Sequence, residues 1–277
     1  MRTFTLLDKD GVSYNLTEKT AAFLYNVEGL GYTRDVEYQQ IGDRYESVRN
    51  NLAQGVIEGV IRFQNPDAYQ KYFAFVQFCQ NAPLRLVYTP VTTQFYRDGM
   101  VTSISKTEGA DGVLSCTIQF SASSPFYKVL YEYNPGVITG GKTYSYEYNY
   151  LYSNSIAGTV VMNNDSYLSC PTKITIYGYA VNPTWRHYVN NVLVSTGKVN
   201  TTIEDGHKLV IDTTTVPYSI KQFDMSNALI SDLYQLSDFS TGRFVNLQNG
   251  RNTISVAHDG SSLLKLGVEA RISYASV

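Results

Sequence analysis

The stretch Gly55–Pro90, GVIEGVIRFQNPDAYQKYFAFVQFCQNAPLRLVYTP, places one helical segment between two strand-like segments. In its middle, Asn65 is a favourable N-cap, Pro66 suits the first helical position and Asp67 complements the positive end of the helix dipole. Apolar residues then recur with helical spacing and form one stripe, made of Tyr69, Tyr72, Phe73, Val76 and Cys79. Because Pro83 follows directly, we expect a helix that ends near residue 81 and packs through this stripe against a sheet.

The segments on either side of this helix read as short β-strands between turn residues. Residues 3–16, TFTLLDKDGVSYNL, predict a hairpin joined through Lys9–Gly11. Residues 95–123 predict two further strands that are joined around Glu108–Gly112. The N-terminal half is therefore expected to be a β-domain with one helix.

The second half of the chain has the same strand-like pattern from about Ser155 onward. Turns such as Asn249–Gly250 and Asp259–Gly260 separate these strands at intervals typical of a sandwich or jelly roll. Residues 226–241 fit either a short helix or an irregular loop. The last strand of the first half ends at Ser123–Pro125, so we expect two domains, covering residues 1–132 and 133–277.

A nucleotide-binding pattern, G-x-x-x-x-G-K-[ST], is matched by Gly136–Thr143. A phosphate-binding loop needs a helix to leave it, because the helix N-terminus supplies amides to the phosphates. Here Lys142 and Thr143 are followed instead by tyrosines at every second residue, a strand pattern formed by Tyr144, Tyr146, Tyr148, Tyr150 and Tyr152. We interpret the match as accidental. The stretch is expected to connect the two domains, with Tyr144, Tyr146, Tyr148 and Tyr150 as candidate interface or interdomain residues.

The composition limits the classes of partner. The formal net charge is −2 over 277 residues, which lacks the basic excess that nucleic-acid binding usually requires. Tyrosine is abundant, with 24 copies, and its apolar ring with a polar tip suits protein interfaces. No apolar run is long enough to span a bilayer and no secretory signal is visible, so we expect a protein folded in the cytosol without a membrane partner.

The sequence predicts neither catalysis nor a bound cofactor or metal. Cys79, Cys116 and Cys170 are far apart and lack metal-binding spacing, so reduced, buried thiols are expected. There is no G-x-S-x-G motif, and no pair of carboxylates stands out as an acid–base pair. One stretch with a different candidate role is GYAVNPTWRHYVNN, where Trp185, Tyr188 and Tyr179 could stack against a sugar; the alternative is that Trp185 packs at a sandwich rim or in a subunit contact.

Many moderate matches in a fixed order now indicate a family. The first half contains GLGYTRDVEYQQIGDRY, EGVIRF, the helix segment, PLRLVYTP, FYRDGMVTSISKTE and LSCTIQFSASSPFYK. The second half contains GTVVMNNDSYLSCPTKITIYGYAVNP, GHKLVIDT, GRFVNLQNGRNTISV and the terminal EARISYAS. In this order and spacing the chain resembles the distal tail proteins of siphophages, or prophages, of Gram-positive bacteria.

The resemblance implies a mainly β fold: an N-terminal β-sandwich ring (belt) domain with one α-helix, followed by a C-terminal jelly-roll or galectin-like β-sandwich that is also similar to carbohydrate-binding modules. It implies a homo-hexameric ring at the virion tail tip that joins the tail tube protein to the tail-associated tip or lysin protein and to receptor-binding or baseplate proteins. DNA would pass through the ring as cargo. The family supplies no catalytic residues.

A second function is also compatible with the sequence. The C-terminal domain could be a lectin-like module that recognises host cell-wall carbohydrate. The two readings are compatible, because a ring could carry several weak sugar sites and gain avidity from them.

Overall fold

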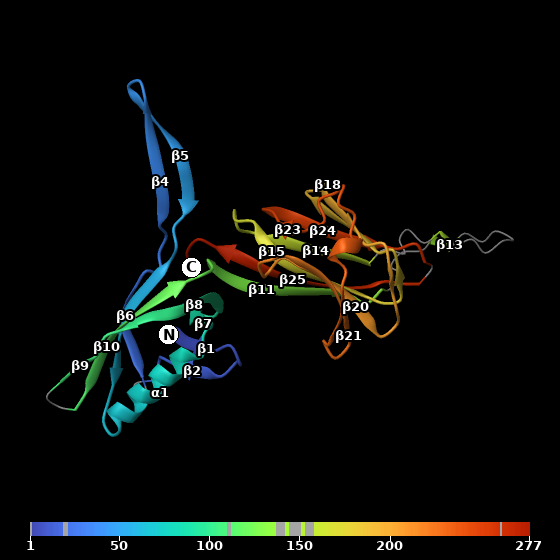
Figure 1. Ribbon diagram of the computed structural model, residues 1–277. Helices are drawn as coiled ribbons and strands as arrows, with labels where there is room; N and C mark the ends of the chain where they lie inside the picture. The colour runs from blue at the N-terminus through green and yellow to red at the C-terminus, as the bar shows by residue number, and fades with distance from the viewer. Residues whose placement is uncertain are drawn as a thin grey trace. The chain divides into compact units, whose positions relative to one another are not determined.

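The computed structural model describes residues 2–18, 22–109, 112–136, 142–143, 151–152, 158–260 and 262–277. Its contacts divide the chain into two compact units. The first comprises Met1–Lys128 together with Tyr274–Val277, and the second comprises Val129–Ser273. Both units are built mainly from antiparallel strands, and the expected mainly β fold with one α-helix is confirmed (Figure 1).

The first unit contains one α-helix and most of the strands of the N-terminal half. The elements are β1 (Thr3–Leu7), β2 (Ser13–Asn15), β3 (Phe23–Glu28), β4 (Arg34–Ile41), β5 (Arg44–Leu52), β6 (Val56–Phe63), α1 (Ala68–Gln80), β7 (Leu84–Thr89), β8 (Phe95–Ile104), β9 (Thr107–Glu108), β10 (Leu114–Ala122) and the start of β11 (Phe126–Asn134). The expected hairpin at residues 3–16 is present, since β1 pairs with β2.

A strongly bent sheet forms the body of the first unit, in the order β2-β1-β7-β8-β10-β6-β3. Strand β8 allows the bend because its first half pairs with β7 and its second half with β10. Alternate residues of the strands point inward. For example, Ile57, Ile61 and Phe63 of β6 are buried, whereas Glu58 and Arg62 are exposed. Burying such apolar surface is the main stabilising contribution to the unit.

Helix α1 packs on this sheet, but only part of the stripe that the sequence predicts faces it: Tyr72 and Cys79 pack against the core. Phe75 is fully buried and lies 5.8 Å from Phe63, ring centre to ring centre. Tyr69 and Phe73, both in the predicted stripe, are instead 45% and 62% exposed. The prediction was wrong at these positions because aromatic residues occur on several faces of α1, so periodicity alone does not select one. The N-terminus also differs: the helix begins at Ala68, and Asp67 is the cap residue, without a side-chain capping hydrogen bond.

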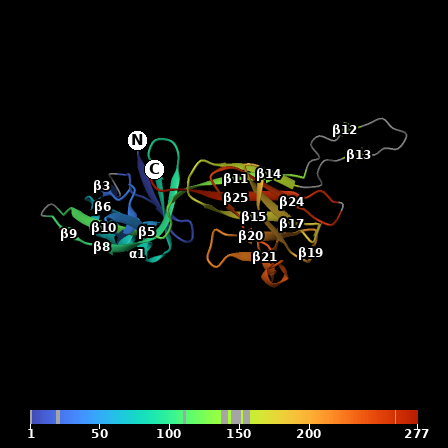
Figure 2. The ribbon, with the colours of Figure 1, turned by 90° about the horizontal axis from the view of Figure 1, so that it is seen from above.

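The second unit is a two-layer β-structure, seen from two directions in Figures 1 and 2. Its elements are β12 (Lys142–Thr143), β13 (Leu151–Tyr152), β14 (Gly158–Asn164), β15 (Cys170–Tyr177), β16 (Ala180–Val181), β17 (Thr184–Val189), β18 (Val192–Lys198), β19 (Thr202–Ile203), β20 (His207–Asp212), β21 (Ser219–Asp224), β22 (Leu229–Asp232), the 3-10 helix η1 (Tyr234–Leu236), β23 (Asn246–Leu247), β24 (Gly250–Ala257) and β25 (Lys265–Tyr274). Residues 226–241 thus contain a short strand and a 3-10 turn.

One layer of the second unit has the order β14-β24-β17-β18, and the other runs from β11 through β25, β15, β20 and β21 to β22. Their inward-facing residues form a common core. Ile174 and Ile176 of β15 contribute from one layer, and Trp185 of β17 with Ile254 and Val256 of β24 contribute from the other. The C-terminal β-sandwich expected from the sequence is confirmed.

Candidate functional site

Hairpin β4–β5 is the most exposed element of the first unit (Figure 1). Almost every side chain of its two strands is exposed, and the strands pair with each other along their whole length. A two-stranded hairpin is at best marginally stable in water when nothing covers it. An arm of this kind is therefore a candidate for packing against another protein.

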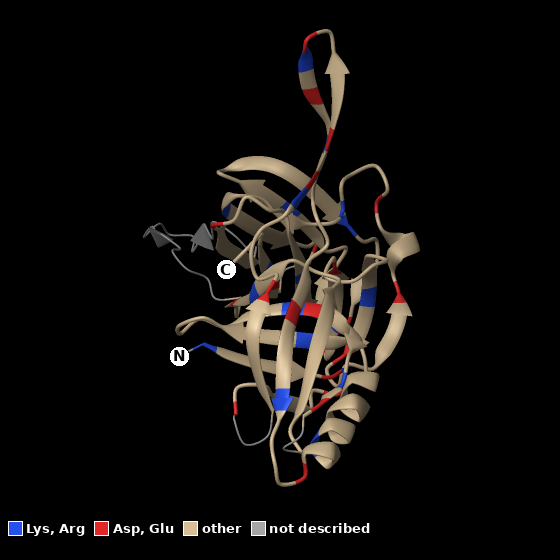
Figure 3. Cartoon of the chain, turned by 90° about the vertical axis from the view of Figure 1, so that its left-hand side faces the viewer, with Lys and Arg blue, Asp and Glu red and all other residues tan. Residues whose placement is uncertain are grey.

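The register of the hairpin gives its two faces different characters. Tyr38 lies opposite Ser47 and Tyr45 lies opposite Gln40, so the two tyrosines share one face, and their exposed fractions are 62% and 68%. Charged residues occupy the other face, including Asp35 and Arg49, which form an exposed ion pair of 3.3 Å. Figure 3 shows that acidic and basic residues alternate along the hairpin rather than forming a block of one sign. The tyrosine face is suited to a protein contact with little charge.

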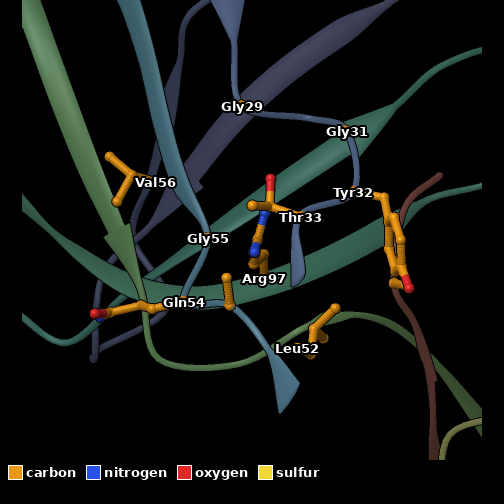
Figure 4. A pocket seen from close by; sticks show the side chains of 11 residues that line it. Gly29, Gly31, Tyr32, Thr33, Leu52, Gln54, Gly55, Val56 and Arg97 are labelled. Atoms are coloured by element: carbon orange, nitrogen blue, oxygen red, sulfur yellow. The ribbon is translucent and has the colours of Figure 1, made fainter. Parts of the chain in front are cut away.

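A cavity of about 410 Å³ lies at the root of this hairpin. The two segments that connect the hairpin to the sheet form its walls, and Arg97 of β8 reaches between Thr33 and Gly55 (Figure 4). The full lining is Gly29, Gly31, Tyr32, Thr33, Leu52, Ala53, Gln54, Gly55, Val56, Arg97 and Ala275. A Cβ at position 55 would lie 1.5 Å from Nη2 of Arg97, so a larger residue there would displace the guanidinium from its present position.

Arg97 is a buried cation without a carboxylate partner among the described residues. Its Nε donates a hydrogen bond to the Ser124 carbonyl at 3.1 Å, and its guanidinium lies 4.6 Å from the ring centre of Phe126. Nη1 has no hydrogen-bond partner. Burial lowers the pKa of Arg97 from its ordinary value, since a buried charge is poorly solvated. The neighbouring carboxylate, Asp98, is bound to Arg85 and to the Tyr127 hydroxyl.

The second unit contains an aromatic cleft next to the segment that leads into β21. Two adjoining cavities of about 440 and 610 Å³ share the residues Val216, Pro217, Tyr218 and Tyr234. Phe244 lies 5.2 Å from Tyr218 and 6.3 Å from Tyr234, ring centre to ring centre. The polar part of the lining includes Lys221, Asp232 and Gln235. Rings next to hydrogen-bonding groups are the arrangement that a small polar ligand requires.

The three residues predicted to stack on a sugar are not arranged as an exposed platform. Trp185 is 0% exposed, and its indole nitrogen donates to the Arg243 carbonyl at 2.8 Å. Because Gly197 lies directly beneath the ring, the two layers enclose it and neither face is free. Tyr188 is half-buried, whereas Tyr179 is exposed. The burial of Trp185 therefore contradicts a stacking role for this residue, because proximity to Tyr179 and Tyr188 in the sequence carries no information on which rings are exposed.

The aromatic cleft was missed by the sequence reasoning. Tyr218, Tyr234 and Phe244 come from three separate segments, so no local motif brings them together. The available signal was weak: Pro217–Tyr218 is a turn-like aromatic dipeptide, and Phe239 and Phe244 flank an arginine. That arginine, Arg243, lies 4.1 Å from the Phe239 ring centre and donates to the Tyr234 hydroxyl at 3.1 Å.

The accidental nucleotide-binding pattern ends in a strand. Lys142 and Thr143 form β12, which pairs with Leu151–Tyr152. Gly136 has a φ of 77°, a left-handed conformation that suits a turn. Residues 137–141 and the candidate interface residues Tyr144, Tyr146, Tyr148 and Tyr150 lie outside the described residues. Since a phosphate-binding loop places its lysine at the start of a helix, the strand at Lys142 does not fit an ATPase.

The cysteines of the chain are unactivated thiols. All three are free, and burial raises the pKa of Cys79 to about 12 and that of Cys116 to about 11. The pKa of Cys170 is also raised by burial. A thiol must ionise to act as a nucleophile, so these groups are unreactive near neutral pH. Within the described residues, no group of three His, Cys, Asp or Glu residues is placed to hold a metal ion.

No helix in the described part of the chain is both long and apolar enough to cross a membrane.

The site geometry thus comprises an exposed hairpin arm and a cavity on the first unit and an aromatic cleft on the second. Residues 3–123 match the family described as distal tail protein, N-terminal domain. Residues 3–123 are therefore similar to the N-terminal domain of distal tail proteins, and the resemblance inferred from the sequence is confirmed.

Solved structures show that the fold likeness extends over the whole chain. A chain of the phage P2 baseplate in its activated conformation with calcium is 16% identical, with full coverage of both chains and a TM-score of 0.68. The SPP1 Dit protein, described as a paradigm of the hub adsorption apparatus in phages that infect Gram-positive bacteria, is 11% identical, covers 98% of this chain and 99% of its own, and has a TM-score of 0.64. No curated protein matches the sequence.

Proposed function

We propose that this protein is a hub of the phage tail tip whose copies close into a hexameric ring. The ring would join the tail tube protein to the tip or lysin protein and to receptor-binding or baseplate proteins. The observation that carries the proposal is the hairpin β4–β5, whose tyrosine face no other described element of its own unit covers. An arm that packs on a neighbouring copy makes a head-to-tail contact, and such contacts generate rings when the rotation between copies closes.

A second exposed aromatic surface supports the same proposal. Tyr69 and Phe73 of α1 are both exposed large aromatic side chains. Each ring subunit needs two different surfaces, one for each neighbour. The tyrosine face of the hairpin and these two rings of α1 are two such surfaces on the first unit.

The charge of the chain is consistent with DNA passing through the ring as cargo. Tight DNA binding depends on many lysine or arginine contacts to phosphate. The formal net charge is −2, and the hairpin carries charges of both signs. A near-neutral conduit of this kind would exert little electrostatic hold on a moving duplex.

Site-specific photo-cross-linking tests the arm contact directly. We expect p-benzoylphenylalanine at Tyr38 to cross-link to a second copy of the chain and to give a ladder of covalent multimers on a denaturing gel. The same photoreactive residue at Tyr167, which is 94% exposed in the second unit, is the control and should yield far less multimer. Monomer alone from Tyr38, in a preparation that contains assembled particles, would exclude the hairpin as the ring contact.

A lectin-like activity of the second unit is a second candidate, favoured by the aromatic cleft. Sugars offer apolar C–H faces to aromatic rings and hydroxyls to polar side chains. The cleft has Tyr218, Tyr234 and Phe244 for the first kind of contact and Lys221 with Asp232 for the second. This location replaces the stretch around Trp185 as the candidate sugar site.

Binding to cell-wall polysaccharide fragments would test the lectin candidate. We expect Tyr218→Ala to weaken binding about tenfold, because one ring contact contributes about 0.5–1.5 kcal/mol beyond its buried area. Tyr167→Ala removes a more exposed tyrosine that does not line the cleft and should leave affinity unchanged. Equal affinities of wild type and Tyr218→Ala, or no binding of any fragment by wild type, would eliminate the cleft as a sugar site.

A further inference from the structure

Arg97 is a buried cation that has no counter-charge among the described residues of the first unit. The residue is only 4% exposed, and no described acidic group forms an ion pair with it. Burying a cation without a counter-charge is costly, and buried charges in proteins are normally paired. The ring of Phe126 and the Ser124 carbonyl compensate part of this cost but leave Nη1 without a hydrogen bond.

The surroundings of Arg97 are suited to binding an anion. The guanidinium borders a cavity of about 410 Å³, and Gly55 provides the space that lets it lie against the backbone. Gln54, at the cavity wall, is held in place because its amide donates to the Ser121 hydroxyl and the Ala122 carbonyl, each at 3.1 Å. The cavity and the position of the Gln54 side chain are therefore already formed before any ligand binds.

The charge of the lining selects the kind of anion. Apart from Arg97, every lining residue is uncharged. One guanidinium balances one negative charge, and its planar edge matches the two oxygens of a carboxylate. A phosphate dianion would retain an uncompensated charge in the cavity. The cavity also exceeds the size of a lone carboxylate, so it has room for the side chain that carries one.

We propose that Arg97 is the anchor of a carboxylate-binding site at the root of the β4–β5 hairpin. A carboxylate bound there would contact the two segments that connect the hairpin to the sheet, and so hold the arm at its base. The carboxylate comes either from a small free acid or from an Asp or Glu side chain of a second copy of this chain. A carboxylate from a second copy requires the proposed ring, whereas the carboxylate-binding site itself does not depend on the ring.

Nuclear magnetic resonance tests the site in the full wild-type chain, and a variant serves only to assign one resonance. We expect the Nε–H resonance of Arg97, identified by its loss in Arg97→Lys, to shift saturably when sodium acetate is added. Arg85 is the internal control, because its Nε already donates to Asp98 at 2.7 Å and its resonance should stay in place. No shift of the Arg97 signal, or the same shift with sodium chloride at equal ionic strength, would overturn the proposal.

Assembly measurements then distinguish the two sources of the carboxylate. If a second copy supplies it, Arg97→Gln should weaken ring formation at least tenfold, and one amide variant among Asp35→Asn, Glu37→Gln, Asp43→Asn and Glu46→Gln should reproduce that loss. If a free acid supplies it, none of the four variants should weaken assembly while acetate still shifts the Arg97 signal. A chain that never assembles would contradict the ring but leave the acetate titration as a separate test of the site.

Discussion

Trp185→Ala is expected to lower the free energy of unfolding of the second unit by about 3–5 kcal/mol, the range for removing a large aromatic side chain from a core. The ring is fully buried between the layers, and its indole N–H is bound to the Arg243 carbonyl. The substitution leaves both a cavity and an unpaired carbonyl group. Chemical denaturation followed by circular dichroism measures the change, because Trp185 is the only tryptophan and its own fluorescence is lost with it.

Tyr167→Ala is the matched control for this experiment. Tyr167 is 94% exposed, and substitutions at such positions usually change stability by no more than about 0.5 kcal/mol. A Trp185→Ala variant that is as stable as the control would show that the ring does not pack in the core. It would then restore the view of Trp185 as a surface residue that stacks on a ligand.

The double variant Tyr38→Ser/Tyr45→Ser is expected to weaken ring assembly at least 100-fold while each chain stays folded. The two tyrosines form the centre of the exposed hairpin face, and aromatic anchors of this kind often contribute 2 kcal/mol or more each to an interface. They make no contribution to either core, so thermal unfolding of the isolated chain should change little. Sedimentation velocity over a concentration series measures the assembly.

The control for the hairpin variant changes the opposite face. Arg49→Gln removes the exposed ion pair with Asp35, which is worth at most about 1 kcal/mol, and leaves both tyrosines and every carboxylate of the hairpin. Assembly should fall far less than in the double tyrosine variant. Equal assembly by wild type and the tyrosine variant would show that the ring, if formed, uses another surface.

The strands were predictable because their alternation directly reflects burial. In β10, for example, Cys116, Ile118 and Phe120 are buried while Thr117 is exposed, the pattern that the sequence displays. The nucleotide-binding pattern could be dismissed for the same reason, since the residues after Lys142 alternate as a strand does. Local periodicity is thus sufficient to predict a strand where one face is clearly apolar and the other clearly polar.

The helix shows where periodicity fails. Its segment AYQKYFAFVQFCQ contains aromatic residues on more than one face, so several stripes satisfy helical spacing. Contact with Phe63 and Tyr14 selects Phe75 as the buried ring, and those residues lie on other elements. Tertiary packing, which the local sequence does not encode, decided the orientation.

The candidate sites depend on contacts between distant segments, and for that reason the sequence revealed little of them. Arg97 lies within an alternating strand, where its inward position follows from Phe95 and Gly99 on the same side, but the absence of a partner is visible only in three dimensions. The hairpin has polar residues on both strands and gives no core signal. The aromatic cleft joins residues from three segments.

Native mass spectrometry of the purified chain, at concentrations from below 1 μM upward, tests the central claim most directly. The account predicts a dominant closed species with six times the 31.0 kDa mass of the chain and no open-ended series of higher multiples. It also predicts that this species disappears in the Tyr38→Ser/Tyr45→Ser variant. A wild-type protein that remains monomeric at every concentration, even after addition of purified tail tubes, would contradict the ring-forming hub.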